Sequence, residues 1–214
     1  MTGTLILIPT AGERQILKPR LEAVTDSEIR IRLCGFGPVA AAAGTSYLIS
    51  AFRPNRIVLI GIAGALSRDL PPGRAAVFDE VAMYGIGAGT GDAFRTAGDL
   101  GWYHWKEVHE GHETAVGDTI SLQTEPGTES ATQLLTVCSA AATVQDARDR
   151  LARFPDAAAE DMEGFSVALA CAMADVPLTI VRGISNIAGD RDKARWRIVD
   201  ALNAAADLLP EILQ

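Results

Sequence analysis

Residues 159–165 read AEDMEGF and residues 181–186 read VRGISN, with one expected helix between them. Both stretches follow or contain a short apolar run typical of a buried strand, so we interpret them as parallel strands. Glu163 and Asn186 then lie at the ends of two strands. A carboxylate and a carboxamide in these positions could hold a ribose on one side and a purine on the other.

The rest of the chain alternates short apolar runs with helical patterns, which is typical of a largely parallel sheet covered on both faces. Strands are expected at residues 5–8, 29–34, 56–60, 75–81, 134–138, 158–160 and 178–183, and helices at 13–24, 39–52, 147–153, 165–174 and 196–213. Pro19 is expected to interrupt or kink the first helix. We predict one α/β domain over residues 1–214, with a largely parallel mixed central sheet flanked by helices.

One stretch lacks a clear period. Residues 85–105 are rich in glycine and are expected to form a long, mobile loop that acts as a lid. His104, His109 and His112 fall in or beside this irregular region. No H-E-x-x-H pattern and no nearby cysteine accompany them, so we interpret them as residues of a solvated loop and expect no metal site.

Composition excludes several classes of protein. The formal net charge of −8 argues against a nucleic-acid binder, and no apolar run approaches the roughly 18 residues of a membrane span. The start of the chain has no basic segment and no cleavage site of the signal-peptide kind. Cys34, Cys138 and Cys171 are widely separated, which fits a reducing compartment. We therefore expect a cytoplasmic protein with neither a nucleic-acid nor a membrane partner.

Polar or glycine-rich segments follow five of the expected strands, at residues 9–13, 35–37, 61–64, 162–164 and 185–186. In open α/β sheets, ligands bind beyond the carboxyl ends of the strands. We expect these segments to converge on one pocket, which favours an enzyme.

Taken together, the two opening stretches resemble the nucleoside phosphorylase and nucleosidase superfamily, and within it the futalosine hydrolases. Residues 35–40, GFGPVA, are similar to the superfamily's Gly-x-Gly-x-x-Ala, and residues 61–66, GIAGAL, resemble a Gly-Ser-Ala-Gly-Gly-Leu loop of the nucleosidases. The resemblance implies hydrolysis of futalosine to hypoxanthine and dehypoxanthine futalosine, a step of menaquinone biosynthesis that needs no cofactor. It also implies a small-molecule purine nucleoside as partner and a homo-oligomer.

Three residues would carry the chemistry that the resemblance implies. Cleavage of the glycosidic bond builds positive charge on the ribose and negative charge on the base. Glu163 would accept hydrogen bonds from the ribose hydroxyls, Asn186 would bind a 6-oxopurine, and Glu13 would hold the attacking water. The alternative interpretations are that both glutamates favour a helix macrodipole and that Asn186 caps a loop or helix.

Further residues would line the substrate. The resemblance implies that the backbone of Ala63 and Gly64 lines the base and sugar, and that Met162 packs on the ribose. Trp196 would cover the aryl group of the 5′ arm, or would merely anchor the last helix. Ala140 stands where the nucleosidases stack a phenylalanine on the purine. The benzoate of the arm needs an arginine, and Arg14, Arg191 and Arg195 are all available; Arg182, on a strand, is interpreted as structural.

Several functions stay open. Relatives that cleave methylthioadenosine carry Ile-Ser-Asp where this chain has Asn186, which disfavours a 5′-methylthioadenosine/S-adenosylhomocysteine nucleosidase. A purine nucleoside phosphorylase needs cations for phosphate, yet Glu13 follows the first strand and no arginine adjoins Gly61. Water is therefore the expected nucleophile. A non-catalytic nucleoside-binding protein is the remote alternative.

Overall fold

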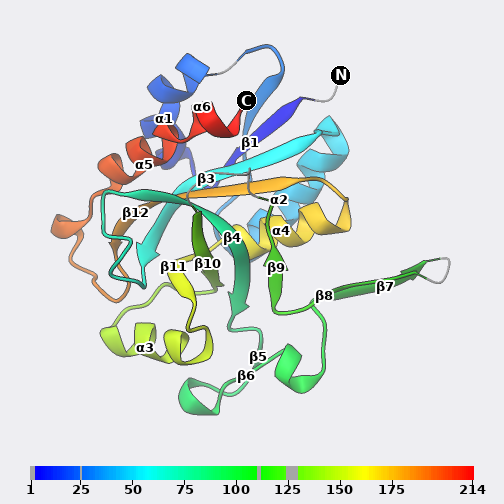
Figure 1. Ribbon diagram of the computed structural model, residues 1–214, viewed down its shortest axis with the longest axis vertical. Coiled ribbons are helices and arrows are strands. Elements are labelled where there is room, and N and C mark those ends of the chain that lie inside the picture. The colour runs from blue at the N-terminus through cyan, green and yellow to red at the C-terminus, as the bar shows by residue number, and fades with distance from the viewer. Residues whose placement is uncertain (1–2, 25, 110–111, 124–129) are drawn as a thin grey trace.

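A computed structural model describes residues 3–24, 26–109, 112–123 and 130–214. Within them, an eight-stranded mixed sheet runs in the order β11-β10-β4-β12-β3-β1-β2, with β9 paired to β4 (Figure 1). Its strands are β1 (Thr4–Ile8), β2 (Ile29–Leu33), β3 (Arg56–Ala65), β4 (Ala75–Tyr84), β9 (Thr119–Ser121), β10 (Ser130–Val137), β11 (Ala157–Asp161) and β12 (Leu178–Ile187). Most neighbouring strands are parallel, as expected, while β12 and β9 run antiparallel to β4.

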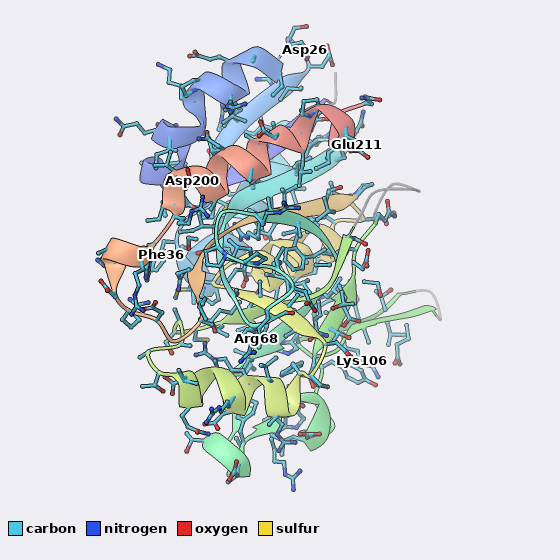
Figure 2. All side chains as sticks on the ribbon, turned by 60° about the vertical axis from the view of Figure 1, so that its left-hand side comes forward. Asp26, Phe36, Arg68, Lys106, Asp200 and Glu211 are labelled. Atoms are coloured by element: carbon cyan, nitrogen blue, oxygen red, sulfur yellow. The ribbon has the colours of Figure 1, made fainter. Side chains whose placement is uncertain are left out.

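Helices cover both faces of the sheet (Figure 1). They are α1 (Ala11–Val24), α5 (Ile198–Asp207) and α6 (Leu209–Ile212) on one face, α2 (Gly37–Phe52) and α4 (Gly164–Met173) on the other, and α3 (Val144–Arg153) at one end. Successive strand side chains point to opposite faces, so Leu5 and Leu7 enter the core beneath α2 and α4, whereas Ile6 and Ile8 enter the core beneath α1 and α5. Charged side chains such as Asp26 and Glu211 lie at the outside (Figure 2).

The sheet closes on itself at β3, which the sequence did not predict. Gly64 of β3 pairs with Asn186 of β12 on one side and with Glu160 of β11 on the other. β3 is parallel to β12 but antiparallel to β11, so the interpretation of β11 and β12 as parallel strands is wrong. Residues 61–64 and 185–186 belong to strands rather than to loops. Because β11 runs antiparallel along the end of β3, the carboxyl ends of β3, β11 and β12 lie side by side.

The glycine-rich stretch 85–105 is more ordered than expected. It contains the short paired strands β5 (Gly87–Ala88) and β6 (Arg95–Thr96) and the 3-10 turns η1 (Gly91–Ala93) and η2 (Gly98–Leu100). Phe94 is buried, its ring lies 4.8 Å from the ring of Tyr84, and its carbonyl accepts a hydrogen bond from Arg153 of α3. The stretch is thus attached to the sheet and to α3.

A hairpin replaces the solvated loop expected around the histidines. β7 (Trp105–His109) pairs antiparallel with β8 (His112–Val116) and projects from the sheet (Figure 1). His104 lies 3.3 Å from Asp118, between Nε2 and Oδ1, and its ring lies 4.7 Å from that of Phe165. The side chains of His109 and His112 lie outside the described residues. In the described part of the chain, no group of three His, Cys, Asp or Glu could hold a metal ion.

Prolines act differently in the first and last helices. α1 continues through Pro19 to Val24, so the expected interruption does not occur. The expected helix over residues 196–213 is instead divided into α5 and α6, and the separate turn η3 (Lys193–Arg195) precedes them. Pro210 lies in the first turn of α6, where a missing N–H is tolerated. Trp196 therefore precedes the helix that it was expected to begin. None of the described helices is long and apolar enough to cross a membrane.

Candidate active site

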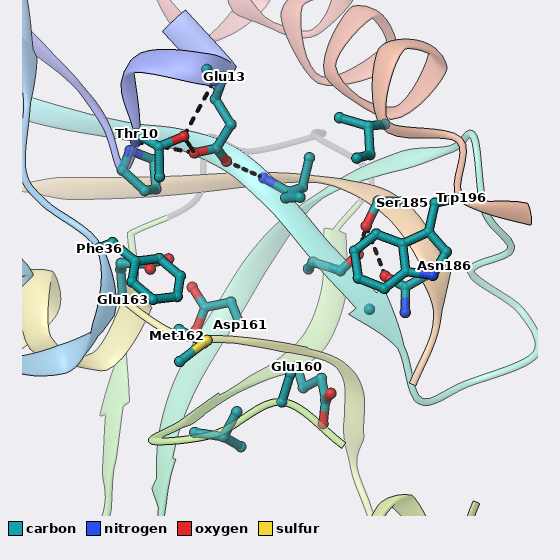
Figure 3. Close-up of a pocket in the computed structure, with 18 of the residues that line it drawn as sticks. Thr10, Glu13, Phe36, Glu160, Asp161, Met162, Glu163, Ser185, Asn186 and Trp196 are labelled. Carbon is teal, nitrogen blue, oxygen red and sulfur yellow. Dashed lines mark hydrogen bonds between the residues drawn. The ribbon is translucent and has the colours of Figure 1, made fainter. Parts of the chain in front are cut away.

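A cavity of about 470 Å³ opens where the five predicted segments meet (Figure 3). Residues of every one of these segments line it, so the predicted convergence is confirmed. The seven residues singled out in the sequence, Glu13, Ala63, Gly64, Met162, Glu163, Asn186 and Trp196, all line this one cavity. No described residue of the 85–105 stretch lines it, and the role of that stretch as a lid stays a prediction.

Glu13 is fixed from two directions. Its N–H donates to Thr10 Oγ1 at 3.2 Å, and its Oε2 accepts from the Thr10 N–H at 3.1 Å, which is a capping box at the start of α1. Its Oε1 accepts from the N–H of Ile62 in β3 at 3.0 Å. Oε2 of Glu13 thus has the helix-terminus role of the alternative interpretation, whereas Oε1 binds the buried carboxylate to β3 in the wall of the cavity.

Glu163 lies between β11 and α4, and is buried. Its Oε1 accepts from the Gly37 N–H, at the start of α2, at 2.9 Å. Its Oε2 lies 3.4 Å from Nη2 of Arg182. Burial raises the pKa of Glu163 from 4.5 to about 7; the Arg182 charge opposes that rise, and Asp161 and Glu13 add to it. Glu163 can therefore change its charge near neutral pH.

Arg182 is the functional candidate whose setting the sequence did not reveal. It is fully buried in β12, and its Nε and Nη2 lie 3.0 and 2.5 Å from Oδ2 of Asp161. Its Nη1 has no hydrogen-bond partner among the described residues. A Cβ added at Gly61 would come within 2.2 Å of that Nη1 and 2.9 Å of Glu13 Oε1. The buried Arg182 cation therefore lies among the carboxylates of Asp161, Glu163 and Glu13. A charged residue inside a strongly apolar strand is the sequence signal that could have indicated this buried cation.

Asn186 is half-buried near the end of β12. Its Oδ1 lies 2.8 Å from Oγ of Ser185, and its Nδ2 donates to the carbonyl of Ile187 at 2.9 Å. Ser185 Oγ also lies 3.2 Å from the Ala63 carbonyl, which links the amide to β3. Because Asn186 is inside a strand, it does not cap a helix.

Glu160, rather than a phenylalanine, lies in the cavity wall next to the segment that carries Ala140. Glu160 forms a buried ion pair with Arg150, and its Oε1 accepts from the Ala141 N–H at 2.8 Å. Arg150 also donates to the carbonyl of Ser139 at 2.7 Å. These contacts hold the segment that carries Ala140 against the cavity.

Two aromatic side chains lie at opposite parts of the cavity wall (Figure 3). Phe36, 65% exposed, lies beside Glu163 and Met162, and it was not singled out in the sequence. Trp196 is held by a hydrogen bond of 3.1 Å from Nε1 to the Asp190 carbonyl. Both rings therefore belong to the wall of the same cavity as the predicted ribose and base contacts.

Comparison with known proteins agrees with this arrangement. A family model described as "Phosphorylase superfamily" matches residues 20–214. The chain is 33% identical over 183 residues to the futalosine hydrolase of Streptomyces coelicolor, covering 83% of this chain and 75% of that protein. It is 31% identical over 175 residues to the 5′-methylthioadenosine/S-adenosylhomocysteine nucleosidase of Colwellia psychrerythraea, covering 76% and 68% of the two chains.

Solved structures share the fold at lower identity. The native futalosine hydrolase of Helicobacter pylori strain 26695 is similar with a TM-score of 0.75 and 19% identity, over 99% of this chain and 97% of that one. The Colwellia psychrerythraea nucleosidase in complex with adenine is similar with a TM-score of 0.77 and 22% identity, over 99% and 94%. The single α/β domain with its mixed, mostly parallel sheet is thus a fold shared with nucleosidases.

Proposed function

The chain belongs to the phosphorylase superfamily, and from that premise we propose that it hydrolyses the N-glycosidic bond of futalosine. The products would be hypoxanthine and dehypoxanthine futalosine, and the reaction would belong to menaquinone biosynthesis. The relative from Streptomyces coelicolor named futalosine hydrolase supports this choice. Asn186 carries the proposal, because it faces the same cavity as Glu13 and Glu163.

Glu163 would bind the ribose. An ionised carboxylate accepts hydrogen bonds from two hydroxyl groups, and these bonds strengthen as the sugar gains positive charge in the transition state. The Gly37 N–H and Arg182 hold the two oxygens of Glu163 in place. Because burial raises the pKa of this carboxyl to about 7, the ionised form prevails only above that pH.

Asn186 would bind the departing base. Its amide offers donors to O6 of a 6-oxopurine and an acceptor to a protonated N7. Negative charge that develops on the base is thereby stabilised. An aspartate at this position would instead suit the 6-amino group of adenine.

Glu13 would direct the attacking water. The water oxygen forms a bond to C1′ while the bond from C1′ to the base nitrogen breaks with its electron pair. Glu13 takes a proton from the water and afterwards releases it to solvent, and the base takes up a proton from solvent to leave as neutral hypoxanthine. Arg182, with its unpartnered Nη1 beside Gly61 and Glu13, would balance the charge of this carboxylate.

The adenine-specific nucleosidases are the second candidate. The 31% identical relative from Colwellia psychrerythraea and the similar nucleosidase structures favour it, whereas Asn186 disfavours it. A phosphorylase is a weaker candidate, because the Glu13 carboxylate would repel phosphate at the place where that anion would bind.

We further propose that the protein is a cytoplasmic homo-oligomer. Three free thiols, Cys34, Cys138 and Cys171, support a reducing compartment. α2 exposes Val39 and Tyr47 along one face that continues from Phe36, and such a face suits contact with a second copy. Light scattering coupled to gel filtration tests the oligomer, and a monomer at micromolar concentration would refute it.

The decisive experiment measures free base released from futalosine, inosine and methylthioadenosine by the purified protein, with and without phosphate. We expect phosphate-independent release of hypoxanthine from futalosine, abolished by Glu163→Gln. Release of adenine from methylthioadenosine instead would favour the second candidate. A strict requirement for phosphate would refute hydrolysis, and Asn203→Asp, outside the cavity, serves as a control for the preparation.

A further inference from the structure

One basic side chain, Arg191, lines the cavity in the described part of the chain. Its guanidinium carbon lies 5.1 Å from the centre of the Trp196 ring, within the range of a cation–π contact. Arg191 is exposed, whereas Glu13 and Glu163 are buried, so the cation lies at the outer rim of the cavity. No ion pair joins Arg191 to a carboxylate of the described residues.

Two acidic groups of the cavity wall are already paired with arginines behind it. Glu160 pairs with Arg150, and Asp161 pairs with Arg182. The inner wall therefore carries carboxylates whose partners come from the protein itself. An anionic part of a substrate would be repelled from that wall, and among the described residues that line the cavity it would find a free cation only at Arg191.

Neighbouring arginines do not offer the same contact. Arg195 binds Asp190 at 3.0 Å and Asp192 at 3.2 Å, and it does not line the cavity. Arg14 lines a separate hollow on the outer side of α1. Arg191 is thus the one candidate of the three with both an unpaired charge and access to the cavity.

The contact with Trp196 suits Arg191 for a carboxylate. A guanidinium that lies over an aromatic ring keeps its in-plane N–H groups available, and two of them match the two oxygens of a carboxylate. The ring is itself fixed by the hydrogen bond from Trp196 Nε1 to Asp190. Both partners are therefore held in place before a ligand binds, which lowers the entropic cost of binding.

We propose that Arg191 binds the carboxylate of the substrate's 5′ arm and thereby determines specificity for an acidic 5′-aryl nucleoside. This inference rests on the proposed function, since futalosine carries a benzoate at the far end of its arm. In this role Arg191 contacts the 5′ arm and not the reacting bond. It would therefore bind the arm equally well in the ground state and in the transition state. Its contribution should therefore fall on KM rather than on kcat.

The test compares futalosine with its neutral methyl ester on wild-type protein, Arg191→Ala and Arg195→Ala. We expect the wild type to prefer futalosine in kcat/KM by on the order of tenfold to a hundredfold, as for a charge-assisted pair. In Arg191→Ala this ratio should approach one, through a higher KM for futalosine. Arg195→Ala should keep the wild-type ratio. A ratio unchanged in Arg191→Ala, or lost equally in Arg195→Ala, would overturn the inference.

Two further measurements separate this inference from the proposed function. Calorimetric binding of futalosine to wild type and Arg191→Ala reports the contact without turnover. Binding that depends on Arg191 but is not followed by hypoxanthine release would refute the hydrolase and support the role of Arg191. Hypoxanthine release that does not depend on Arg191 would support the hydrolase and refute the role of Arg191. Inosine 5′-monophosphate supplies a phosphate as the anion, and an Arg191-dependent preference for it over futalosine would overturn the carboxylate assignment.

Discussion

Two requirements on Glu163 oppose one another, namely its ionisation and its burial. It must be ionised to bind ribose hydroxyls, yet it is buried, and burial raises its pKa to about 7. A group with this pKa is half-protonated at neutral pH. The activity of the protein should consequently respond to pH in the physiological range.

We expect kcat/KM for futalosine to fall as the pH decreases through about 7, because the protonated Glu163 loses an acceptor for the ribose. The acidic side of the pH profile should follow the titration of one group, so kcat/KM should fall tenfold per pH unit well below the pKa. Steady-state rates between pH 5 and 9 test this. A profile that stays flat from pH 5 to 7 would contradict the role given to Glu163.

The same pKa predicts that Glu163→Gln stabilises the fold at alkaline pH. The folded carboxyl holds its proton up to about pH 7 and the unfolded one only to 4.5, so the folded state binds more protons between these values. Ionisation therefore costs stability that grows as the pH rises through this window, up to about 3 kcal/mol. Urea unfolding at pH 4.5 and 8 should show the gain of the variant over wild type only at pH 8.

Asn186→Asp should move specificity toward adenine. An ionised side chain at this position has no donor for O6 of hypoxanthine, and its acceptors suit the 6-amino group. We expect hypoxanthine release to fall by about tenfold or more and adenine release from methylthioadenosine to rise. Asn203→Asp adds the same charge away from the cavity and should change neither rate.

The order of strands and helices along the chain decides which parts of the site could be predicted from the sequence. The convergence of strand ends followed from the alternation of strands and helices, because parallel strands bring their carboxyl ends to one edge. The extension of β3 and β12 through glycine and serine did not follow, since these residues are typical of loops. Two of these glycines are required by close neighbours, because a Cβ at Gly61 would meet Arg182 and Glu13, and a Cβ at Gly183 would meet the backbone of Ala201 in α5.

Gly61 offers a test of this crowding within β3. An alanine Cβ at this position would lie 2.2 Å from Nη1 of the fully buried Arg182 and 2.9 Å from Glu13. We expect Gly61→Ala to lower the free energy of unfolding by about 1–3 kcal/mol and to reduce kcat/KM, because both charged groups must move. At Gly117 nothing lies within 4 Å of an added Cβ, so Gly117→Ala should leave both quantities near wild type. Equal effects of the two substitutions would contradict the steric argument.

Across the whole molecule, the class of fold was predictable and its closure was not. Alternating apolar runs indicate a covered sheet from local pattern alone. The pairing of Glu160 with Gly64, and the burial of Arg182 beside Asp161, arise from contacts between segments far apart in the sequence. The pairing of β7 with β8 was missed for a local reason, because charged residues interrupt the apolar alternation of both strands.

Asp161 connects the closure of the sheet to the chemistry of the site. It accepts from Arg182 of β12, from Thr136 Oγ1 of β10 at 2.6 Å and from the Gly164 N–H of α4 at 2.8 Å. Asp161→Asn keeps the shape but removes the hydrogen-bonded carboxylate of the buried Arg182, which leaves Glu163, at 3.4 Å, and Glu13 as its neighbouring carboxylates. We expect a loss of roughly 3–5 kcal/mol in the free energy of unfolding, because one partner of a buried ion pair is removed.

The substitution should also act on Glu163. The Asp161 charge raises the pKa of Glu163, so its removal should move the acid limb of kcat/KM to lower pH. The exposed pair of Arg197 and Asp200 provides the control, and Asp200→Asn should cost no more than about 1 kcal/mol without shifting the limb. Urea unfolding and pH–rate profiles on both variants measure the two effects. An Asp161→Asn protein as stable as Asp200→Asn would mean that the closed sheet does not depend on this ion pair.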